Sequence, residues 1–334
     1  MTARILCLGE VSWDRFWLLR RFPSRLAEIE FSASLQAQPQ LDLEHQPLVA
    51  QAAPGGCALN TAGVLRAYGL PASLAGNYLG MDETGLRIQA YLKAAGIDSG
   101  LIARADVETP FCQVWVEAES GHRDFTLRHL DIQRTGPECW EPWVDACARG
   151  EISHAFVQPY NREISHEFLR AIQKSRGPWV MIQDVDPGSP FVEWADAVQI
   201  SFPEPVTATA RAPGKASYKA LSETDDGALI AALAENYFSA DRRGRCQRIL
   251  VTAGGRGVAL CERGRDTELF APVVAAEVKD TTGCGDAFRA GLMAALYRGQ
   301  DWRSAVGEGQ RAGAIKAGIY GSHFLAFPTG AGAP

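Results

Sequence analysis

The sequence has none of the features that mark exported, membrane-spanning or disulfide-stapled proteins. Its eight cysteines are scattered and include no Cys-x-x-Cys pair, so metal-ligand spacing is absent and a disulfide framework is not expected in a chain of 334 residues. No apolar run approaches the ~20 residues that a membrane helix needs. The first apolar run, residues 5–8, is ended by Gly9 and Glu10 too early for a secretory signal. We therefore expect a cytoplasmic protein with reduced thiols.

An excess of positive charge is also missing. Lys and Arg number 33 against 39 Asp and Glu, which gives a formal net charge of −6, and no Lys/Arg cluster reverses this locally. Such a balance argues against a nucleic-acid or anionic-membrane surface. The six histidines form no ligand cluster. We expect a small-molecule partner, with no nucleic acid and no membrane.

Two common nucleotide-binding motifs are absent or fail on inspection. No Gly-x-x-x-x-Gly-Lys-[Ser/Thr] occurs, so a P-loop mechanism is unsupported. Gly283 and Gly285 begin a dinucleotide fingerprint, but Phe288 stands where its third glycine belongs. The segment 307–312 matches Gly-x-Gly-x-x-Ala inside an expected helix with no strand before it, and we interpret it as chance. An NAD-dependent oxidoreductase is thereby disfavoured.

Short apolar runs alternate with helical patterns along most of the chain. Strands are expected at 4–10, 72–75, 154–157, 179–183, 197–200, 248–252, 258–261 and 267–270, and helices at 57–68, 83–95, 284–297 and 304–319. Apolar strands separated by helices predict a parallel, helix-flanked sheet. We predict an α/β protein with one domain over residues 1–330, a polar loop at 206–224 and a short tail at 331–334.

Two segments interrupt this pattern. In the first, residues 31–35 partly alternate polar and apolar. In the second, residues 111–116 and 123–127 alternate and flank the turn residues Ser120 and Gly121, which is a hairpin signal. Alternation predicts short antiparallel strands with one exposed face. We therefore expect a discontinuous β-strand lid from about 11–54 and 109–130.

The strongest chemical signal is the segment 280–286, which reads Asp-Thr-Thr-Gly-Cys-Gly-Asp and opens directly into a helix. A Gly-x-Gly turn lets backbone approach a ligand closely, and the first amide groups of a helix attract a phosphoryl group. Asp286 could then accept the proton of an attacking hydroxyl. The competing interpretation is that the glycines shape a turn and Asp286 merely caps the helix.

With this segment the sequence resembles the PfkB-type, or ribokinase-like, carbohydrate kinases. Their C-terminal signature is Asp-Thr-x-Gly-Ala-Gly-Asp, and their N-terminal signature is a Gly-Gly-x-x-x-Asn run that opens a helix. Residues 55–60 fit the second, 80–85 resemble the next family segment, and 252–257 resemble the Thr-x-Gly-x-x-Gly near the nucleotide. The matches keep family order across nearly the whole chain. The resemblance implies a three-layer α/β/α fold with a central, mostly parallel sheet and a small β-strand lid.

The resemblance also implies roles for individual residues in a transfer that uses ATP and Mg²⁺, with K⁺ as an additional cofactor. Asp286 would be the catalytic base. The amides of Gly283, Cys284 and Gly285 would form an anion hole. Substrate would be held by Asp14, Gly55, Gly56 and Asn60, the nucleotide by Thr252, Gly254 and Gly257, and a monovalent cation by Asp280 and Thr282.

Arg123 and Glu204 are weaker assignments. Arg123, in the expected lid hairpin, could reach a phosphate or a substrate hydroxyl, and a solvated lid charge is an equal alternative. Glu204 matches the Glu of the family's Asn-x-x-Glu segment, which is tied to magnesium, but Ser201 replaces the Asn. Arg289 lies three residues after Asp286, and we expect it to form a surface salt bridge.

Several departures and alternatives remain open at this point. Cys284 replaces the family Ala, and its thiol is either activated by the helix terminus or buried and inert. The segment 158–161 stands where relatives have a small turn, which suggests an unusual substrate pocket. The aromatic residues Trp13, Phe16 and Trp17 keep a nucleoside kinase open; they serve equally as lid core or as a homodimer contact between lids. A non-catalytic ligand-binding regulator is the alternative from another class.

Overall fold

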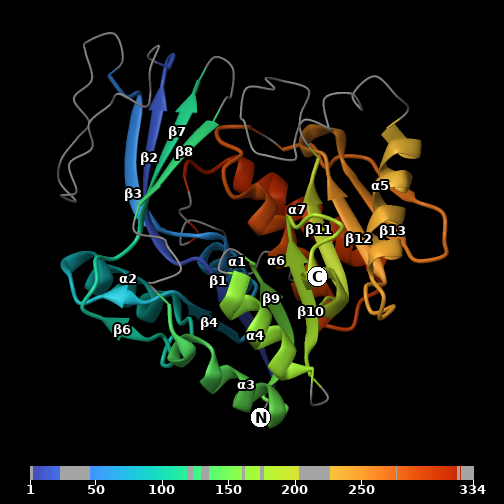
Figure 1. Cartoon of the computed structure of the whole chain (residues 1–334). Helices are drawn as coiled ribbons and strands as arrows, with labels where there is room; N and C mark the ends of the chain where they lie inside the picture. Colours follow the sequence, from blue (N-terminus) through green and yellow to red (C-terminus); the bar gives the residue numbers. More distant parts are fainter. Residues whose placement is uncertain are drawn as a thin grey trace.

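The centre of the molecule is an eight-stranded sheet with helices on both faces (Figure 1). The computed structural model describes residues 3–22, 46–118, 123–128, 135–159, 162–173, 177–202, 226–275, 277–321 and 324. Neighbouring strands are parallel from β4 through β12, and β13 and β14 continue antiparallel, which confirms the predicted mostly parallel sheet. Across the sheet the strands are β14 (Glu268–Phe270), β13 (Val258–Glu262), β12 (Arg248–Thr252), β11 (Ala197–Ser201), β10 (Trp179–Gln183), β9 (Ile152–Val157), β1 (Arg4–Gly9) and β4 (Ala72–Gly76).

The alternation of side chains along β1 separates two hydrophobic cores, one on each face of the sheet. Ile5 and Cys7 pack with α1 (Cys57–Ala67), α2 (Glu83–Ala95), α6 (Cys284–Tyr297) and α7 (Trp302–Ala317). Leu6 and Leu8 pack with α3 (Glu141–Ala148), α4 (Arg162–Ile172) and α5 (Asp226–Ala240). The fold is therefore the expected three-layer α/β/α arrangement. None of the helices in the described ranges is long and apolar enough to cross a membrane.

Helix α6 is enclosed by the rest of the fold. Every residue from Asp286 to Ala295 is buried, including the charged Asp286 and Arg289. Helix α7 packs closely against it, because a Cβ on Gly309 would lie 2.8 Å from the Phe288 carbonyl oxygen. Glycine at this position serves helix packing, so the match at 307–312 lies inside α7 and is not a nucleotide-binding turn.

A second, four-stranded sheet stands to one side of the main sheet (Figure 1). Its order is β3 (Val49–Gly55), β2 (Ser12–Leu19), β7 (Phe111–Glu117) and β8 (Arg123–Arg128). The two predicted lid segments thus pair with each other, and β7 and β8 are antiparallel as predicted. A separate two-stranded sheet joins β5 (Leu79–Gly80) to β6 (Arg104–Ala105).

Each lid segment is internally antiparallel, as predicted, because β2 pairs with β3 and β7 pairs with β8 in opposite directions. The two segments meet through the parallel pair β2 and β7. The expectation of one exposed face was wrong, since β2 is buried along its whole length. The reason is that β2 is an interior strand with apolar side chains on both faces. Phe16 packs with Tyr320 on one face, while Trp17 stacks on Trp115 on the other. The predictions for residues 31–35, for the loop at 206–224 and for the tail at 331–334 lie outside the described residues.

The segment 80–85 is organised around the cap of α2. Asp82 caps the helix by accepting a hydrogen bond from the Gly85 amide at 2.7 Å. The same carboxylate accepts from the amide and hydroxyl groups of Thr109, each at 2.7 Å. Because Thr109 lies two residues before β7, this acidic cap fixes the connection between the main domain and the second sheet.

Candidate active site

The turn that opens α6 carries no side-chain cap. Gly283 occupies the N-cap position with φ 78°, a left-handed conformation that favours glycine, and no side chain caps the helix. The Cys284 amide donates to the Thr281 carbonyl at 3.2 Å. Within the described residues, the amides of Gly283 and Gly285 have no such acceptor. Of the three predicted anion-hole amides, two are therefore available in this structure and one is engaged within the turn.

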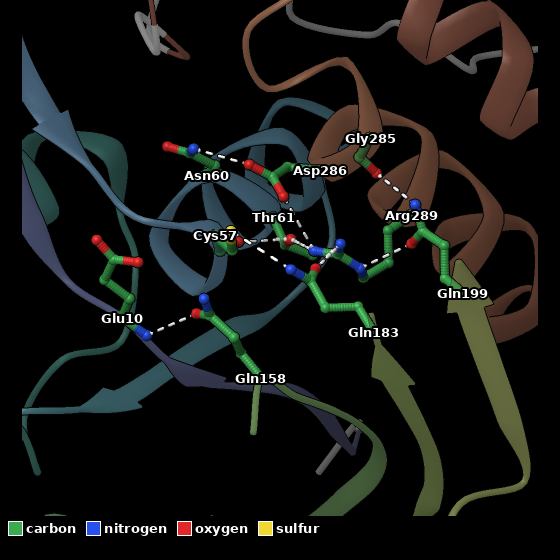
Figure 2. Close-up of polar contacts among 10 residues, drawn as sticks. All are labelled: Glu10, Cys57, Asn60, Thr61, Gln158, Gln183, Gln199, Gly285, Asp286 and Arg289. Carbon is green, nitrogen blue, oxygen red and sulfur yellow. Dashed lines mark hydrogen bonds and ion pairs between the residues drawn. The ribbon is translucent and has the colours of Figure 1, made fainter. Parts of the chain in front are cut away.

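Asp286 lies one residue beyond this turn and is held by two partners from different helices (Figure 2). Asn60 Nδ2 donates to one carboxylate oxygen at 2.8 Å, and Arg289 Nη1 contacts the other at 3.2 Å. The aspartate is only 7% exposed. Its carboxylate makes no capping bond to α6, so the geometry does not support the simple helix-cap interpretation.

Arg289 corrects our expectation of a surface salt bridge. It is 2% exposed, and its guanidinium lies over the Phe156 ring at 3.9 Å. Besides Asp286, it donates to Thr61 Oγ1 and Gln199 Oε1, each at 2.9 Å, and to Gln183 Oε1. Sequence spacing placed the residue on a helix face, but it could not show that this helix is covered on every side.

Three glutamines from adjacent strands of the main sheet converge around these groups (Figure 2). Gln199 Nε2 donates to the Gly285 carbonyl at 3.1 Å, which ties β11 to the first turn of α6. Gln183 ends β10 and contacts Cys57 Sγ at 3.6 Å. Gln158 follows β9 and accepts from the Glu10 amide at 2.8 Å. Sequence reasoning noted only Gln158; the others could be found only once the strands were placed side by side.

On the predicted substrate side of the site, Gly55 and Gly56 lie close to Asp14 and Glu10. A Cβ on Gly55 would lie 1.9 Å from an Asp14 carboxylate oxygen, and one on Gly56 would lie 2.3 Å from the Glu10 carbonyl oxygen. Gly56 also has φ 98°. Position 56 therefore requires glycine, whereas a side chain at position 55 would displace the Asp14 carboxylate. Asp14 is buried rather than solvated, and it accepts from Ser12 Oγ at 2.8 Å.

Glu10 is an additional acid that the sequence analysis did not assign to the site. Burial raises the pKa of its carboxyl to about 7, and the negative charges of Asp14 and, more weakly, Asp286 act in the same direction. Gln158 opposes this shift by hydrogen bonding. The negative charges of both predicted acids therefore act on the Glu10 carboxyl, and we call Glu10, Asp14 and Asp286 together the acidic cluster.

Asn60 contributes a free acceptor to this cluster. Its Nδ2 is occupied by Asp286, whereas its Oδ1 is buried and has no hydrogen-bond partner among the described residues. A buried carbonyl oxygen without a donor is uncommon in folded proteins. A ligand hydroxyl would satisfy it.

The thiols near the site are not activated nucleophiles. Burial raises the pKa of Cys284 to about 11, although the positive charge of Lys316 opposes the shift. Burial also raises the pKa of Cys57, and Asp286 adds to that effect. Of the two possibilities for Cys284, the structure therefore supports the inert thiol.

The remaining predicted residues fall into separate groups. Arg123 lies on β8, is partly exposed, and its positive charge weakly lowers the pKa of Cys284, so the second sheet carries a cation within electrostatic reach of the α6 turn. Asp280 and Thr282 are buried together below the turn, where Asp280 accepts from the Thr282 amide and hydroxyl at 2.9 and 2.8 Å. Glu204 lies outside the described residues.

The predicted nucleotide residues lie at and after the carboxyl end of β12. Thr252 is the last residue of β12, and its hydroxyl donates to the Ile200 carbonyl at 3.3 Å. Gly254 and Gly257 have φ 54° and 106°, and a Cβ on Gly257 would lie 2.1 Å from the Phe270 carbonyl oxygen. In open α/β sheets, ligands bind outside the carboxyl ends of the strands, which is where this turn lies.

Comparison with known proteins places the chain in a family. The pattern that defines the pfkB family carbohydrate kinases matches residues 42–329. The chain therefore belongs to the pfkB family of carbohydrate kinases. It is 27% identical over 346 aligned residues to the bifunctional protein HldE of Pseudomonas aeruginosa. That alignment covers 98% of this chain but 62% of HldE, so the chain corresponds to only part of that relative.

Solved structures confirm the ribokinase-like fold. A ribokinase of Arabidopsis thaliana, complexed with ribose and ATP, superposes with a TM-score of 0.72 at 17% identity, covering 98% of this chain and 96% of that one. A nucleoside kinase of Burkholderia thailandensis, in complex with inosine, gives a TM-score of 0.70 at 19% identity, covering 98% and 94%. At these identities the likeness establishes the fold alone.

Proposed function

We propose that this protein is an ATP-dependent kinase that transfers the γ-phosphate to a hydroxyl of a small sugar or sugar-like molecule, with Asp286 as the general base. One observation carries this proposal: a buried carboxylate, held by Asn60 and Arg289, lies at the uncapped N-terminus of α6. A hydroxyl that contacts Asp286 would meet its base and the phosphate-binding turn together. Phosphoryl transfer needs such positioning and charge stabilisation more than covalent chemistry.

The chain's own residues divide the work. Asp286 accepts the proton of the attacking hydroxyl, while Asn60 and Arg289 fix the direction of its two oxygens. The amides of Gly283 and Gly285 stabilise negative charge on the transferred group, together with the positive end of the α6 dipole. Arg123 would add a positive charge from the second sheet, which we propose closes as a lid and excludes water.

The acidic cluster supports a polyhydroxylated acceptor. Carboxylates of Glu10 and Asp14 accept hydrogen bonds from hydroxyl groups, and the free Asn60 Oδ1 accepts another. A nucleoside acceptor receives less support from the aromatic residues near Asp14. Phe16 and Trp17 are buried in the second sheet, and the Trp17 indole donates to Gln113 Oε1 at 2.6 Å. They serve as the core of that sheet rather than as a surface for a base.

The residues present are compatible with ATP and Mg²⁺, which would arrive together. Gly254 and Gly257, after β12, adopt positive φ and carry no side chain that would cover the backbone there, and a Ser201-to-Thr252 pairing brings the ends of β11 and β12 together. The described residues contain no cluster of three or more His, Cys, Asp or Glu that could hold a metal ion. That is acceptable for Mg²⁺, which keeps its waters and binds mainly through substrate phosphates, where it neutralises charge.

The test is ADP release with Mg-ATP across sugars, sugar acids, sugar phosphates and nucleosides. We compare the parent protein with Asp286→Asn and with the control Asp145→Asn, which changes an exposed aspartate on α3. We expect turnover on a sugar-type acceptor, a loss of roughly 10²- to 10⁴-fold in Asp286→Asn and no change in the control. Turnover confined to nucleosides would shift the acceptor class. Ligand-induced thermal stabilisation without any turnover would favour a binding regulator.

A further inference from the structure

Lys316 is a buried charge that the proposed reaction does not use. It lies in the last turn of α7 and is 0% exposed. Its ammonium donates to the Ile319 carbonyl at 2.7 Å and lies 3.5 Å from the Asp280 carbonyl oxygen. The same nitrogen is 3.8 Å from an Asp280 carboxylate oxygen, and both side chains are fully buried. Lysines are almost never fully buried unless they are paired, so this arrangement requires an explanation.

The partner, Asp280, joins the turn before α6 to the segment after α7. Its carboxylate accepts from the Thr282 amide and hydroxyl, and from the Gly321 amide at 2.8 Å. The backbone adds two bonds between the same segments, from the amides of residues 279 and 280 to the Ala317 carbonyl at 2.7 and 3.0 Å. The ammonium and the carboxylate together therefore fix the base of the anion-binding turn.

The position of Lys316 bears directly on the predicted monovalent-cation site. A Cβ on Gly283 would lie 3.7 Å from Lys316 Cε, so the side chain passes immediately beneath the α6 turn. The oxygens around its ammonium are a carboxylate and two backbone carbonyls, which is the donor set that a hard cation would take. The Lys316 ammonium already supplies these oxygens with one positive charge. The residues at Asp280 and Thr282 therefore do not fit an additional K⁺.

We propose that the Lys316 ammonium takes the place of a dissociable monovalent cation beneath the anion-binding turn, so that this chain works without K⁺. The ammonium balances Asp280, holds the turn in shape and adds positive charge below Gly283 and Gly285. Its field reaches the turn, because it is the largest influence that opposes the burial-induced rise in the pKa of Cys284. Lys316 is thus a positioning residue that acts through the turn, not a residue that contacts substrate.

The inference depends on the proposed kinase function only where activity is measured; the melting temperature can be measured without it. Both quantities are measured in the chlorides of K⁺, NH₄⁺, Na⁺ and tetramethylammonium at equal ionic strength. The variants are Lys316→Ala, which opens space for an ion, and Lys316→Met, which keeps volume but not charge. Lys93→Met, on the exposed side of α2, is the matched control.

We expect the parent and the control to behave alike in all four salts. Lys316→Ala should lose activity by about tenfold or more, because a buried carboxylate has lost its partner and the turn has lost its support. K⁺ or NH₄⁺, but not tetramethylammonium, should restore that activity in part and raise the melting temperature of this variant by about 3 °C or more. Lys316→Met should be impaired in every salt.

Activation or stabilisation of the parent protein by K⁺ overturns the proposal, as does full activity of Lys316→Ala in tetramethylammonium. If Lys316→Ala does not fold, the parent protein and Lys316→Met still test the proposal. The proposal is overturned if the parent responds to K⁺. It is also overturned if Lys316→Met has the melting temperature and activity of the parent. The melting temperatures do not depend on turnover. A cation response of the parent therefore refutes the role of Lys316 even if no acceptor is found, and a missing acceptor alone refutes only the kinase proposal.

Discussion

Replacing Arg289 with Met should destabilise the protein more than any surface arginine could. The substitution keeps an unbranched side chain over the Phe156 ring but removes the charge. Asp286 then loses one of its two holding contacts, and Gln183 and Gln199 lose the donor that their side-chain oxygens accept. All of this happens at a position with 2% exposure, where water cannot readily replace the missing donors.

The expected loss can be estimated from these contacts. Breaking a buried ion pair by removing one partner typically costs about 3–5 kcal/mol, because the remaining charge is uncompensated. For a chain of this length, a loss in that range lowers the melting temperature by about 4–7 °C. Turnover should fall as well, by about tenfold or more, because the carboxylate of Asp286 is no longer held in one direction.

The assay is urea unfolding at pH 7.5, combined with steady-state kinetics on the best acceptor. Arg170→Met is the matched control, because Arg170 also pairs with an acid three residues away, Glu167 at 2.8 Å, but on an exposed surface. It should change the unfolding free energy by less than about 0.5 kcal/mol. A loss below about 1 kcal/mol in Arg289→Met would show that the buried network does not hold Asp286 and would refute this reasoning.

Three further predictions follow from the site. The pKa of Glu10 is raised from 4.5 to about 7, so the folded state binds its proton more tightly and the unfolding free energy falls as pH rises through that window. Glu10→Gln should therefore be more stable than the parent by about 1–3 kcal/mol at pH 8 and equally stable at pH 4.5. The control Glu235→Gln, on the exposed side of α5, should not change the unfolding free energy at either pH. An equal effect of Glu10→Gln at both pH values would contradict the prediction. Asn60→Ala should lower kcat and raise KM for the acceptor while KM for ATP stays constant, because Asn60 both orients Asp286 and offers Oδ1; an unchanged acceptor KM would remove it from the substrate side. Alkylation of Cys284, followed by mass spectrometry, should be slow at pH 7.5 and should accelerate about tenfold per pH unit toward pH 11, because burial raises its pKa to about 11; a plateau near pH 8 would show an activated thiol.

The elements that sequence reasoning placed well are those with a strong local pattern. Helices α2 and α6 have the bounds expected from their apolar spacing and terminal glycines. The strands of the main sheet were found as apolar runs, because a strand buried on both faces needs no partner to be recognised in the sequence. The turn that opens α6 was placed correctly for the same reason, since its glycines and acid lie within one short segment, and its role in phosphate binding stays a prediction.

The elements that escaped prediction depend on contacts between distant residues. The parallel pairing of β2 with β7 joins segments that no local pattern links. Arg289 meets Gln199 from another layer of the fold, and Lys316 meets Asp280 across a chain reversal. The sequence alone does not distinguish a buried lysine from an exposed one. Only the packing of α7 against the turn shows that the charge of Lys316 lies beneath the site.

The most direct test of the central claim is transfer of a labelled γ-phosphate from ATP to the acceptor identified in the panel, followed by product analysis of the parent protein and of Asp286→Asn. The account predicts a phosphate monoester of the acceptor from the parent protein and a loss of roughly 10²- to 10⁴-fold in the variant, which should still bind the acceptor. Parental transfer rates in Asp286→Asn would contradict the account, because a base other than Asp286 would then be responsible.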